Sequence, residues 1–236
     1  MLVGVYVAKT KINLPSDWNI DEFVLAKSLS KDAKVLFIYA QNYNTIEKMV
    51  DTLNIEPIIL NDDFEELERA RKFGFKVVSG NINSGVLDNF SNKEFDYVVC
   101  EVGLNSARYL SDFLKSVVRI CSDFVLCQKN DGRFSKRLKF LFRGSLYVKN
   151  QYDVIPDDNF AWFNRDPWCL SHKDIVNLCA CCGFIIKRGT IIYKNNDIDN
   201  MYDIRSYPNL SALKIYYTIS NESTIKPTYK LGGSAL

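Results

Sequence analysis

The chain has 236 residues, of which 47% are hydrophobic and 25% are charged, and its formal net charge is +2. A globular chain of this length and composition can bury a substantial core. The small net charge argues against a nucleic-acid partner. No apolar run reaches about eighteen residues, so we expect no membrane span.

Residues 1–18 contain a short alternating apolar segment at positions 2–8. No basic residues precede this segment, so we interpret it as an additional N-terminal strand and not as a signal peptide. Asn19 or Asp21 can then cap the first helix of the chain.

From residue 33 onward, short apolar runs alternate with helical patterns. Alternation at this spacing is typical of an α/β domain with a doubly wound, mostly parallel sheet, here of seven strands. The first five strands are expected at 35–39, 57–60, 76–79, 95–100 and 124–127, and the helices between them near 46–53, at 64–72 and at 110–120.

The segment 130–170 breaks this alternation, and we interpret it as a lid. Within it, residues 134–142 have an amphipathic helical pattern that places Leu138 and Leu141 on one apolar face. We favour packing of this face on the core, the alternative being contact with a membrane surface or an acidic partner. The aromatic stretch 147–168 is suited to a substrate pocket, a protein interface or the core under a long loop.

Ser171 and Asp174 predict a capping box for a helix that Gly183 ends. We expect His172, in the first turn of this helix, to be exposed. The rest of the domain is expected to contain strand material at 184–188 and 190–193, a polar loop at 195–209, a last strand at 212–219 and a loose tail at 221–236. The single domain would therefore span residues 1–220.

The seven cysteines are odd in number, and several fall inside predicted strands or helices. This usage favours reduced, buried thiols in a cytoplasmic protein over a disulfide framework. Cys179, Cys181 and Cys182 lie late in one predicted helix, where their side chains point in different directions. We therefore expect no metal site at this cluster.

Four pieces of sequence follow one another in a characteristic order: Phe95–Val99, Asn130-x-Gly132, Arg137–Gly144 with leucines at 138 and 141, and Ser171-x-x-Asp174. Together with the five strand–helix steps, they resemble the class I S-adenosylmethionine-dependent methyltransferases and, among these, the methionine-biosynthesis MetW family. The resemblance covers roughly residues 17–220. It implies S-adenosylmethionine as cofactor and homoserine O-acetyltransferase as a protein partner.

Active members of the superfamily carry an acidic residue and glycines around the first strand–helix loop. Matched to this chain, the acidic position falls on Phe37 and the glycine positions on Tyr39, Gln41 and Tyr43, while Asn42 stands where an aspartate is common. A Cβ at a glycine position blocks close approach of the cofactor to the backbone. We favour the interpretation that this strand and loop simply pack.

The resemblance also implies a carboxylate after the second strand, for the ribose, and an acidic residue after the third, for the adenine. The first position falls on Leu60, with Asp62 and Asp63 just beyond it. One interpretation is that the ribose-binding carboxylate has moved to Asp62. The favoured interpretation is that Asp62 and Asp63 serve as the N-cap and a first-turn acid of the following helix. At the second position, Asn81 keeps hydrogen-bonding capacity, and Ile82 follows it.

Glu101 follows the fourth strand, at the sheet edge where ligands bind in such folds, and is the best single candidate for an acid or base. Three hypotheses follow. The favoured one is a non-catalytic or partner-binding member with a degraded cofactor motif. The alternatives are an active methyltransferase with an atypical cofactor site and a protein that binds surfaces through its basic lid. Homo-oligomer formation stays open.

Overall fold

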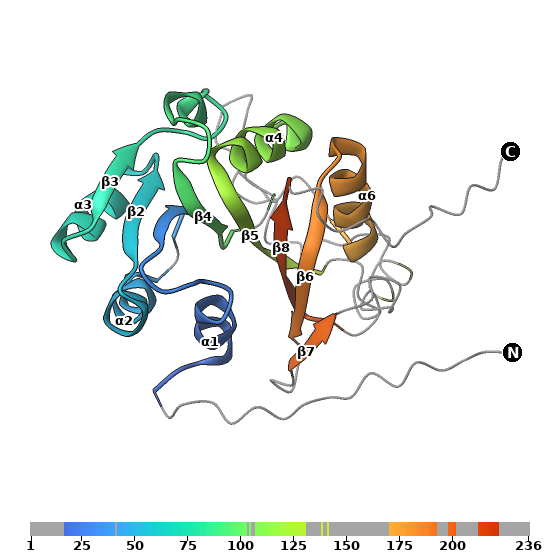
Figure 1. The fold of residues 1–236 in the computed structure, drawn as a ribbon, viewed down its shortest axis with the longest axis horizontal. Helices are drawn as coiled ribbons and strands as arrows, with labels where there is room; N and C mark the ends of the chain where they lie inside the picture. Colours follow the sequence, from blue (N-terminus) through green and yellow to red (C-terminus); the bar gives the residue numbers. More distant parts are fainter. Residues whose placement is uncertain are drawn as a thin grey trace, which may run out of the picture.

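The computed structural model describes residues 17–40, 42–102, 104, 107–130, 138, 141, 170–192, 198–201 and 212–221. Its strands lie side by side in the order β3-β2-β1-β4-β5-β8-β6-β7 (Figure 1). The strands are β1 (Lys34–Ile38), β2 (Glu56–Asn61), β3 (Lys76–Ser79), β4 (Phe95–Cys100), β5 (Cys121–Lys129), β6 (Ile185–Ile192), β7 (Ile198–Met201) and β8 (Lys214–Ser220). The helices are α1 (Ile20–Ala26), α2 (Tyr43–Leu53), α3 (Phe64–Lys72), the 3-10 helix η1 (Val86–Asn89), α4 (Leu110–Ile120) and α6 (His172–Cys182).

The first five strands pair in parallel, and β8 pairs antiparallel with both β5 and β6. This arrangement is the expected doubly wound, mostly parallel sheet of the class I methyltransferase type, so the predicted fold class is confirmed. With β7, the sheet of the described residues has eight strands, one more than predicted. In such a sheet the carboxyl ends of the parallel strands meet at one edge, where ligands bind.

Helices cover both faces of the sheet, and β1 shows how the sequence achieves this. Leu36 and Ile38 belong to the apolar cluster that contains α4 and α6, whereas Val35 and Phe37 belong to the cluster that contains α1, α2 and α3. All four side chains are fully buried. Alternate residues of a strand point to opposite faces, so a strand covered on both faces is a continuous apolar run.

Strand β7 corrects the prediction of a polar loop at 195–209. It pairs antiparallel with β6, from Ile192 opposite Ile198 to Gly189 opposite Met201. Ladder hydrogen bonds come from main-chain groups, which polar and apolar residues share, so a polar segment can form an edge strand. β6 is also one continuous strand through Gly189, with a register irregularity between Ile186 and Arg188.

The predicted helix caps are confirmed, but the predicted exposure of His172 is wrong. Ser171 and Asp174 form the capping box of α6, and Gly183 ends the helix at a φ of 76°. His172 is only 4% exposed. Its Nδ1 lies 2.9 Å from the Tyr217 hydroxyl, and the two rings stack, because the first turn of α6 lies against β8.

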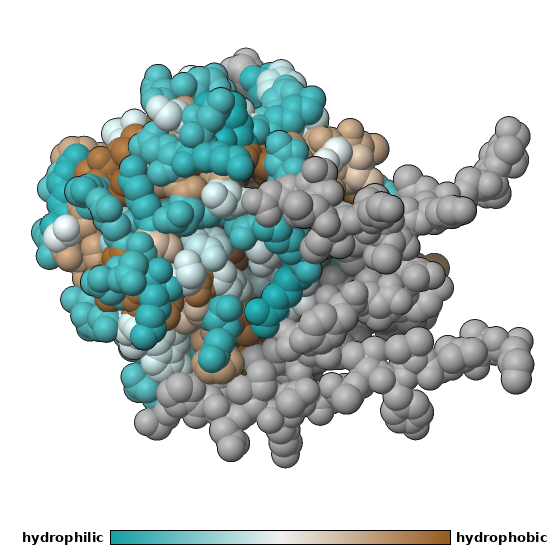
Figure 2. All heavy atoms as spheres, in the orientation of Figure 1, coloured by the Kyte–Doolittle hydropathy of each residue, from teal (hydrophilic) through white to brown (hydrophobic). Residues whose placement is uncertain are grey.

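The predicted N-terminal strand, most of the lid and the C-terminal tail lie outside the described residues. Two lid positions, Leu138 and Leu141, are helical, with exposed fractions of 39% and 74%. The expected packing of these two side chains on the core is therefore wrong. Over much of the described surface in Figure 2, the side chains are hydrophilic. Among the helices of the described residues, none is long and apolar enough to cross a bilayer.

Candidate functional site

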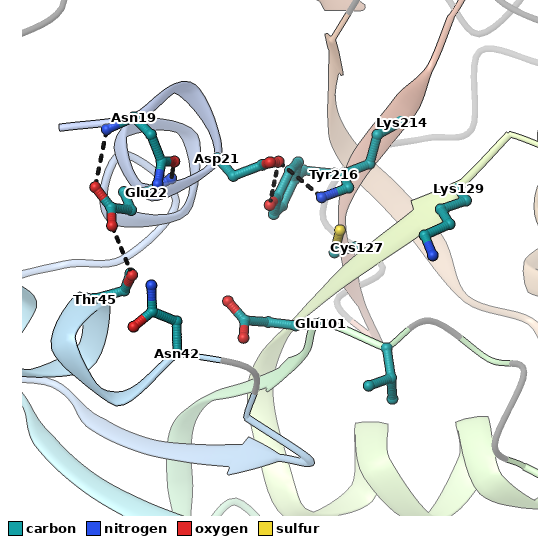
Figure 3. A pocket seen from close by; sticks show the side chains of 11 residues that line it. Asn19, Asp21, Glu22, Asn42, Thr45, Glu101, Cys127, Lys129, Lys214 and Tyr216 are labelled. Carbon is teal, nitrogen blue, oxygen red and sulfur yellow. Dashed lines mark hydrogen bonds and ion pairs between the residues drawn. The ribbon is translucent and has the colours of Figure 1, made fainter.

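A cavity of about 460 Å³ opens at the carboxyl edge of the sheet (Figure 3). One wall is α1, and the opposite side is formed by the ends of β4 and β5 and the start of β8. The N-terminus of α2 completes it. The lining residues are Asn19, Asp21, Glu22, Asn42, Thr45, Glu101, Val102, Cys127, Lys129, Lys214 and Tyr216.

Asp21 joins α1 to β8 across the cavity. Its Oδ1 accepts a hydrogen bond of 2.9 Å from the Tyr216 hydroxyl and lies 3.0 Å from Nζ of Lys214. Burial by itself lowers the pKa of Lys214, but the interactions with its neighbours Cys127, Asp21 and Glu101 outweigh burial and raise it. Lys214 therefore stays a cation at neutral pH.

Glu22 joins α1 to α2 on the same wall. The carboxylate is buried and accepts hydrogen bonds from the Asn19 backbone N–H at 2.9 Å, the Thr45 hydroxyl at 2.8 Å and the Lys48 ammonium at 3.4 Å. Burial by itself would raise the pKa of Glu22, but these three partners together lower it. The wall therefore contains an ionised, internally bonded carboxylate.

Cys127 and Tyr216 are register partners on β5 and β8 and face the cavity. Burial raises the pKa of the Cys127 thiol to about 12, and burial also raises the pKa of Tyr216. Both groups therefore keep their protons at neutral pH. Since the thiolate is the reactive form of cysteine, Cys127 is not an activated nucleophile.

Glu101 and Lys129 contribute the remaining charges of the lining. Glu101 follows β4 directly and is half-buried, and its carboxylate points into the cavity between Asn42 and Cys127 (Figure 3). Lys129 is the last residue of β5, two positions beyond Cys127, so the two side chains share a face of the strand. The structure therefore places Glu101 in the cavity, while its role as an acid or base stays a prediction.

Four of the positions matched to the cofactor site come together beside the cavity, at the ends of β1, β2 and β3. Nδ2 of Asn81 donates a hydrogen bond to Oδ2 of Asp62. The Tyr39 hydroxyl also bonds Asp62 and the backbone at Ile82, and burial, followed by the charge of Asp62, raises its pKa. We call Tyr39, Asp62, Asn81 and Ile82 the Tyr39 cluster. Tyr39 has a φ of 51°, a left-handed value that is costly for a residue with a Cβ.

The other positions matched to the cofactor site have structural contacts. Phe37 and Leu60 are fully buried, and Tyr43 is buried with its hydroxyl donating to the Glu66 carbonyl at 3.0 Å. Asp63 is the N-cap of α3, as the favoured interpretation predicted. Asn42 caps α2 by accepting from the Asn44 amide and also lines the cavity. Gln41 lies outside the described residues.

A family model described as "Methionine biosynthesis protein MetW" matches residues 20–219. The chain belongs to the MetW family. A search of curated proteins found no match. The matched range begins at α1 and ends within β8, so the MetW family model covers all the elements that line the cavity.

Several solved structures with the same fold are methyltransferases of low sequence identity to this chain. A S-adenosylmethionine-dependent methyltransferase of Thermotoga maritima has a TM-score of 0.58 and 16% identity, over 85% of this chain and 87% of that one. A S-adenosylmethionine-dependent methyltransferase of Methanosarcina mazei has a TM-score of 0.55 and 12% identity, over 83% of this chain and 95% of that one. A complex of a methyltransferase activator with a methyltransferase from Haloferax volcanii matches with a TM-score of 0.56 and 12% identity, over 84% of this chain and 87% of the matched chain. These similarities show that this MetW-family chain shares its fold with those methyltransferases.

The sequence indicated Asn42 and Glu101 but missed most of the cavity, including Asp21, Lys214 and Lys129. The sequence did contain a signal for these residues. Cys127 and Lys129 on β5 are two positions apart, as are Lys214 and Tyr216 on β8. Residues two positions apart on a strand lie on the same face of the sheet. No cluster of three or more metal-ligating side chains occurs among the described residues.

Proposed function

We propose that this MetW-family protein acts without S-adenosylmethionine, as a non-catalytic member that works by binding a protein partner. The observation that carries the proposal is the position of Tyr39. Its hydroxyl bonds Asp62 and the Ile82 backbone, at the ends of β2 and β3. By family resemblance these ends are where the nucleoside of the cofactor binds, so a side chain of the protein takes the place of the ligand there.

The residues at the other cofactor positions do not fit S-adenosylmethionine either. Phe37 and Leu60 are fully buried and have no side-chain acceptor for an ammonium or for ribose hydroxyls. Tyr43 is packed against Phe73 and Phe75, so the third glycine position is filled by an aromatic ring of the core. We therefore derive no reaction step through this cofactor.

A protein partner is the second part of the proposal, and the MetW family points to homoserine O-acetyltransferase and to methionine biosynthesis. Support for a partner comes from the Haloferax volcanii methyltransferase, which was solved in complex with an activator. All cysteines among the described residues are free thiols, which supports a reducing compartment such as the cytoplasm.

One observation favours the alternative, an active methyltransferase with an atypical cofactor site. The Asp62–Asn81 pair keeps a carboxylate and an amide at the strand ends where a nucleoside would bind. In that case Tyr39 would have to leave its position when the cofactor enters. Methyl transfer needs little besides positioning of the reactants.

The experiment is a pull-down of purified homoserine O-acetyltransferase by the purified chain, with and without S-adenosylmethionine, beside a calorimetric titration of the cofactor alone. We expect a complex whose amount does not depend on the cofactor, and no binding of the cofactor itself. Absence of a complex overturns the partner assignment. Micromolar cofactor binding supports the alternative and overturns the claim that the protein acts without it.

A further inference from the structure

The cavity beside α1 has a charge balance that points to a particular class of ligand. Its lining carries the carboxylates of Asp21, Glu22 and Glu101 and the ammonium groups of Lys129 and Lys214. The ammonium of Lys48 adds to these, because it pairs with Glu22 at 3.4 Å. The cavity and its wall therefore contain three groups of each sign.

We propose that this cavity binds a small zwitterion carrying one ammonium and one carboxylate group, of the size of an α-amino acid. Glu101 accepts hydrogen bonds from the ammonium group, and Lys129 donates to the carboxylate. The proposal goes beyond the proposed function, because it assigns a small-molecule ligand to a protein that we take to act through a partner.

The contacts on the α1 wall explain why Glu101 and Lys129 are the recognising pair. Asp21 is held by Lys214 and Tyr216, and Glu22 by Asn19, Thr45 and Lys48. A carboxylate offers about four lone pairs, so Glu101 can serve a ligand in addition to its contacts within the protein. Among the described residues, Lys129 takes part in none of the ion pairs.

Charge and size exclude other classes of ligand. A ligand with a net charge would leave an uncompensated charge in a cavity whose own charges are balanced. An uncharged ligand would displace water from Glu101 and Lys129 without offering a charged partner to either side chain. The volume of about 460 Å³ lies within the range of small-molecule sites, roughly 300–1,000 Å³. Asn42 and Thr45 offer neutral polar groups that can orient the rest of the ligand.

This ligand site is separate from the Tyr39 cluster. None of Tyr39, Asp62, Asn81 and Ile82 lines the cavity. A zwitterion can therefore enter while the Tyr39 hydroxyl keeps its bonds to Asp62 and Ile82. In contrast, binding of a nucleoside at the strand ends requires displacement of Tyr39.

The experiment is an NMR titration of the isotope-labelled chain with each of the twenty standard amino acids at about 10 mM, well above the weakest Kd expected for such a ligand. The best binder is then compared with its methyl ester, which keeps only the ammonium, and its N-acetyl derivative, which keeps only the carboxylate. The variants are Glu101→Gln and Lys129→Met. Matched controls are Glu47→Gln and Lys115→Met, at exposed positions of α2 and α4.

We expect at least one amino acid to shift the amide signals of Glu101 and Lys129. Each cavity variant should weaken its binding about tenfold or more, whereas the controls leave it unchanged. Glu101→Gln should not affect the N-acetyl derivative, and Lys129→Met should not affect the methyl ester. The proposal is overturned if no amino acid shifts these signals, or if the cavity variants bind like the controls.

The same spectra keep this proposal apart from the proposed function. If S-adenosylmethionine shifts the amide signals of Asn81 and Ile82, it binds at the Tyr39 cluster, and this result counts against the proposed function. Shifts at Glu101 and Lys129 with an amino acid report on the cavity. Each can fail while the other stands.

Discussion

Asp21 and Lys214 lie 193 positions apart in the chain, yet the Asp21 carboxylate is 3.0 Å from the Lys214 ammonium. The pair ties α1, at the start of the domain, to β8, its last strand, and so closes one side of the cavity. The Tyr216 hydroxyl also donates a hydrogen bond to Asp21. These side-chain contacts across the carboxyl edge of the sheet therefore help to fix the position of α1.

Asp21→Asn should destabilise the protein and loosen α1. The amide keeps an acceptor for Tyr216 but loses the charge opposite Lys214, whose side chain is only 25% exposed. The Asp21 side chain is 45% exposed, so solvent screens part of the pair, and we expect a loss of about 1 kcal/mol in the free energy of unfolding. Urea denaturation measures the loss. The exposed Asp51→Asn, on α2, is the control and should change the free energy by less than about 0.5 kcal/mol; equal effects of the two variants would show that the Asp21 contacts contribute nothing.

Glu22→Gln should remove part of the acid sensitivity of the fold. The pKa of Glu22 is lowered in the folded protein, so its charged contacts stabilise the fold above the unfolded-state pKa. That stabilisation disappears as pH falls through the lowered value. The difference in unfolding free energy between the native protein and the variant should be largest at neutral pH and vanish in strong acid. A difference that does not change with pH would contradict this reading of Glu22.

The His172–Tyr217 pair should contribute measurably to stability, because both side chains are buried. Replacing one partner leaves the other with an unsatisfied polar group, at a cost of about 1–3 kcal/mol. Tyr217→Phe, His172→Phe and the double variant form a cycle measured by urea denaturation. The double variant should lose less stability than the two single variants together. Simple additivity would mean that the two groups do not interact.

Tyr39→Gly should open the strand ends of β2 and β3 to a nucleoside. Glycine adopts the φ of 51° without strain, which offsets part of the lost packing, while the Asp62 carboxylate and the Ile82 backbone lose the Tyr39 hydroxyl and become available to a ligand. We expect S-adenosylhomocysteine to bind this variant at least tenfold more tightly than the native protein, by calorimetry. Tyr39→Phe is the control: it loses the hydroxyl but keeps the ring, and should bind no more tightly than the native protein.

Most of the fold could be predicted because its signals are local. The buried strand β1 is a continuous apolar run, and the cap residues Ser171 and Gly183 mark the two ends of α6. The edge strand β7 could not be predicted, since its pairing with β6 depends on main-chain groups and not on an apolar pattern.

The sequence indicated the positions of Tyr39, Asp62 and Asn81 one by one, but not their arrangement, and it missed most of the cavity. The mutual bonds of these residues depend on the left-handed backbone at Tyr39, which no sequence pattern indicates. The burial of His172 depends on Tyr217, 45 positions further along the chain. Contacts of this kind become visible only once the strands are ordered in the sheet.

In the function proposed for this MetW-family protein, Tyr39 replaces the nucleoside of S-adenosylmethionine. Calorimetric titration of S-adenosylhomocysteine into the native chain tests this replacement directly. We predict no saturable heat up to about 1 mM ligand, which corresponds to less than about 4 kcal/mol of binding free energy. A saturable isotherm with a micromolar Kd would contradict the claim and establish a working cofactor site.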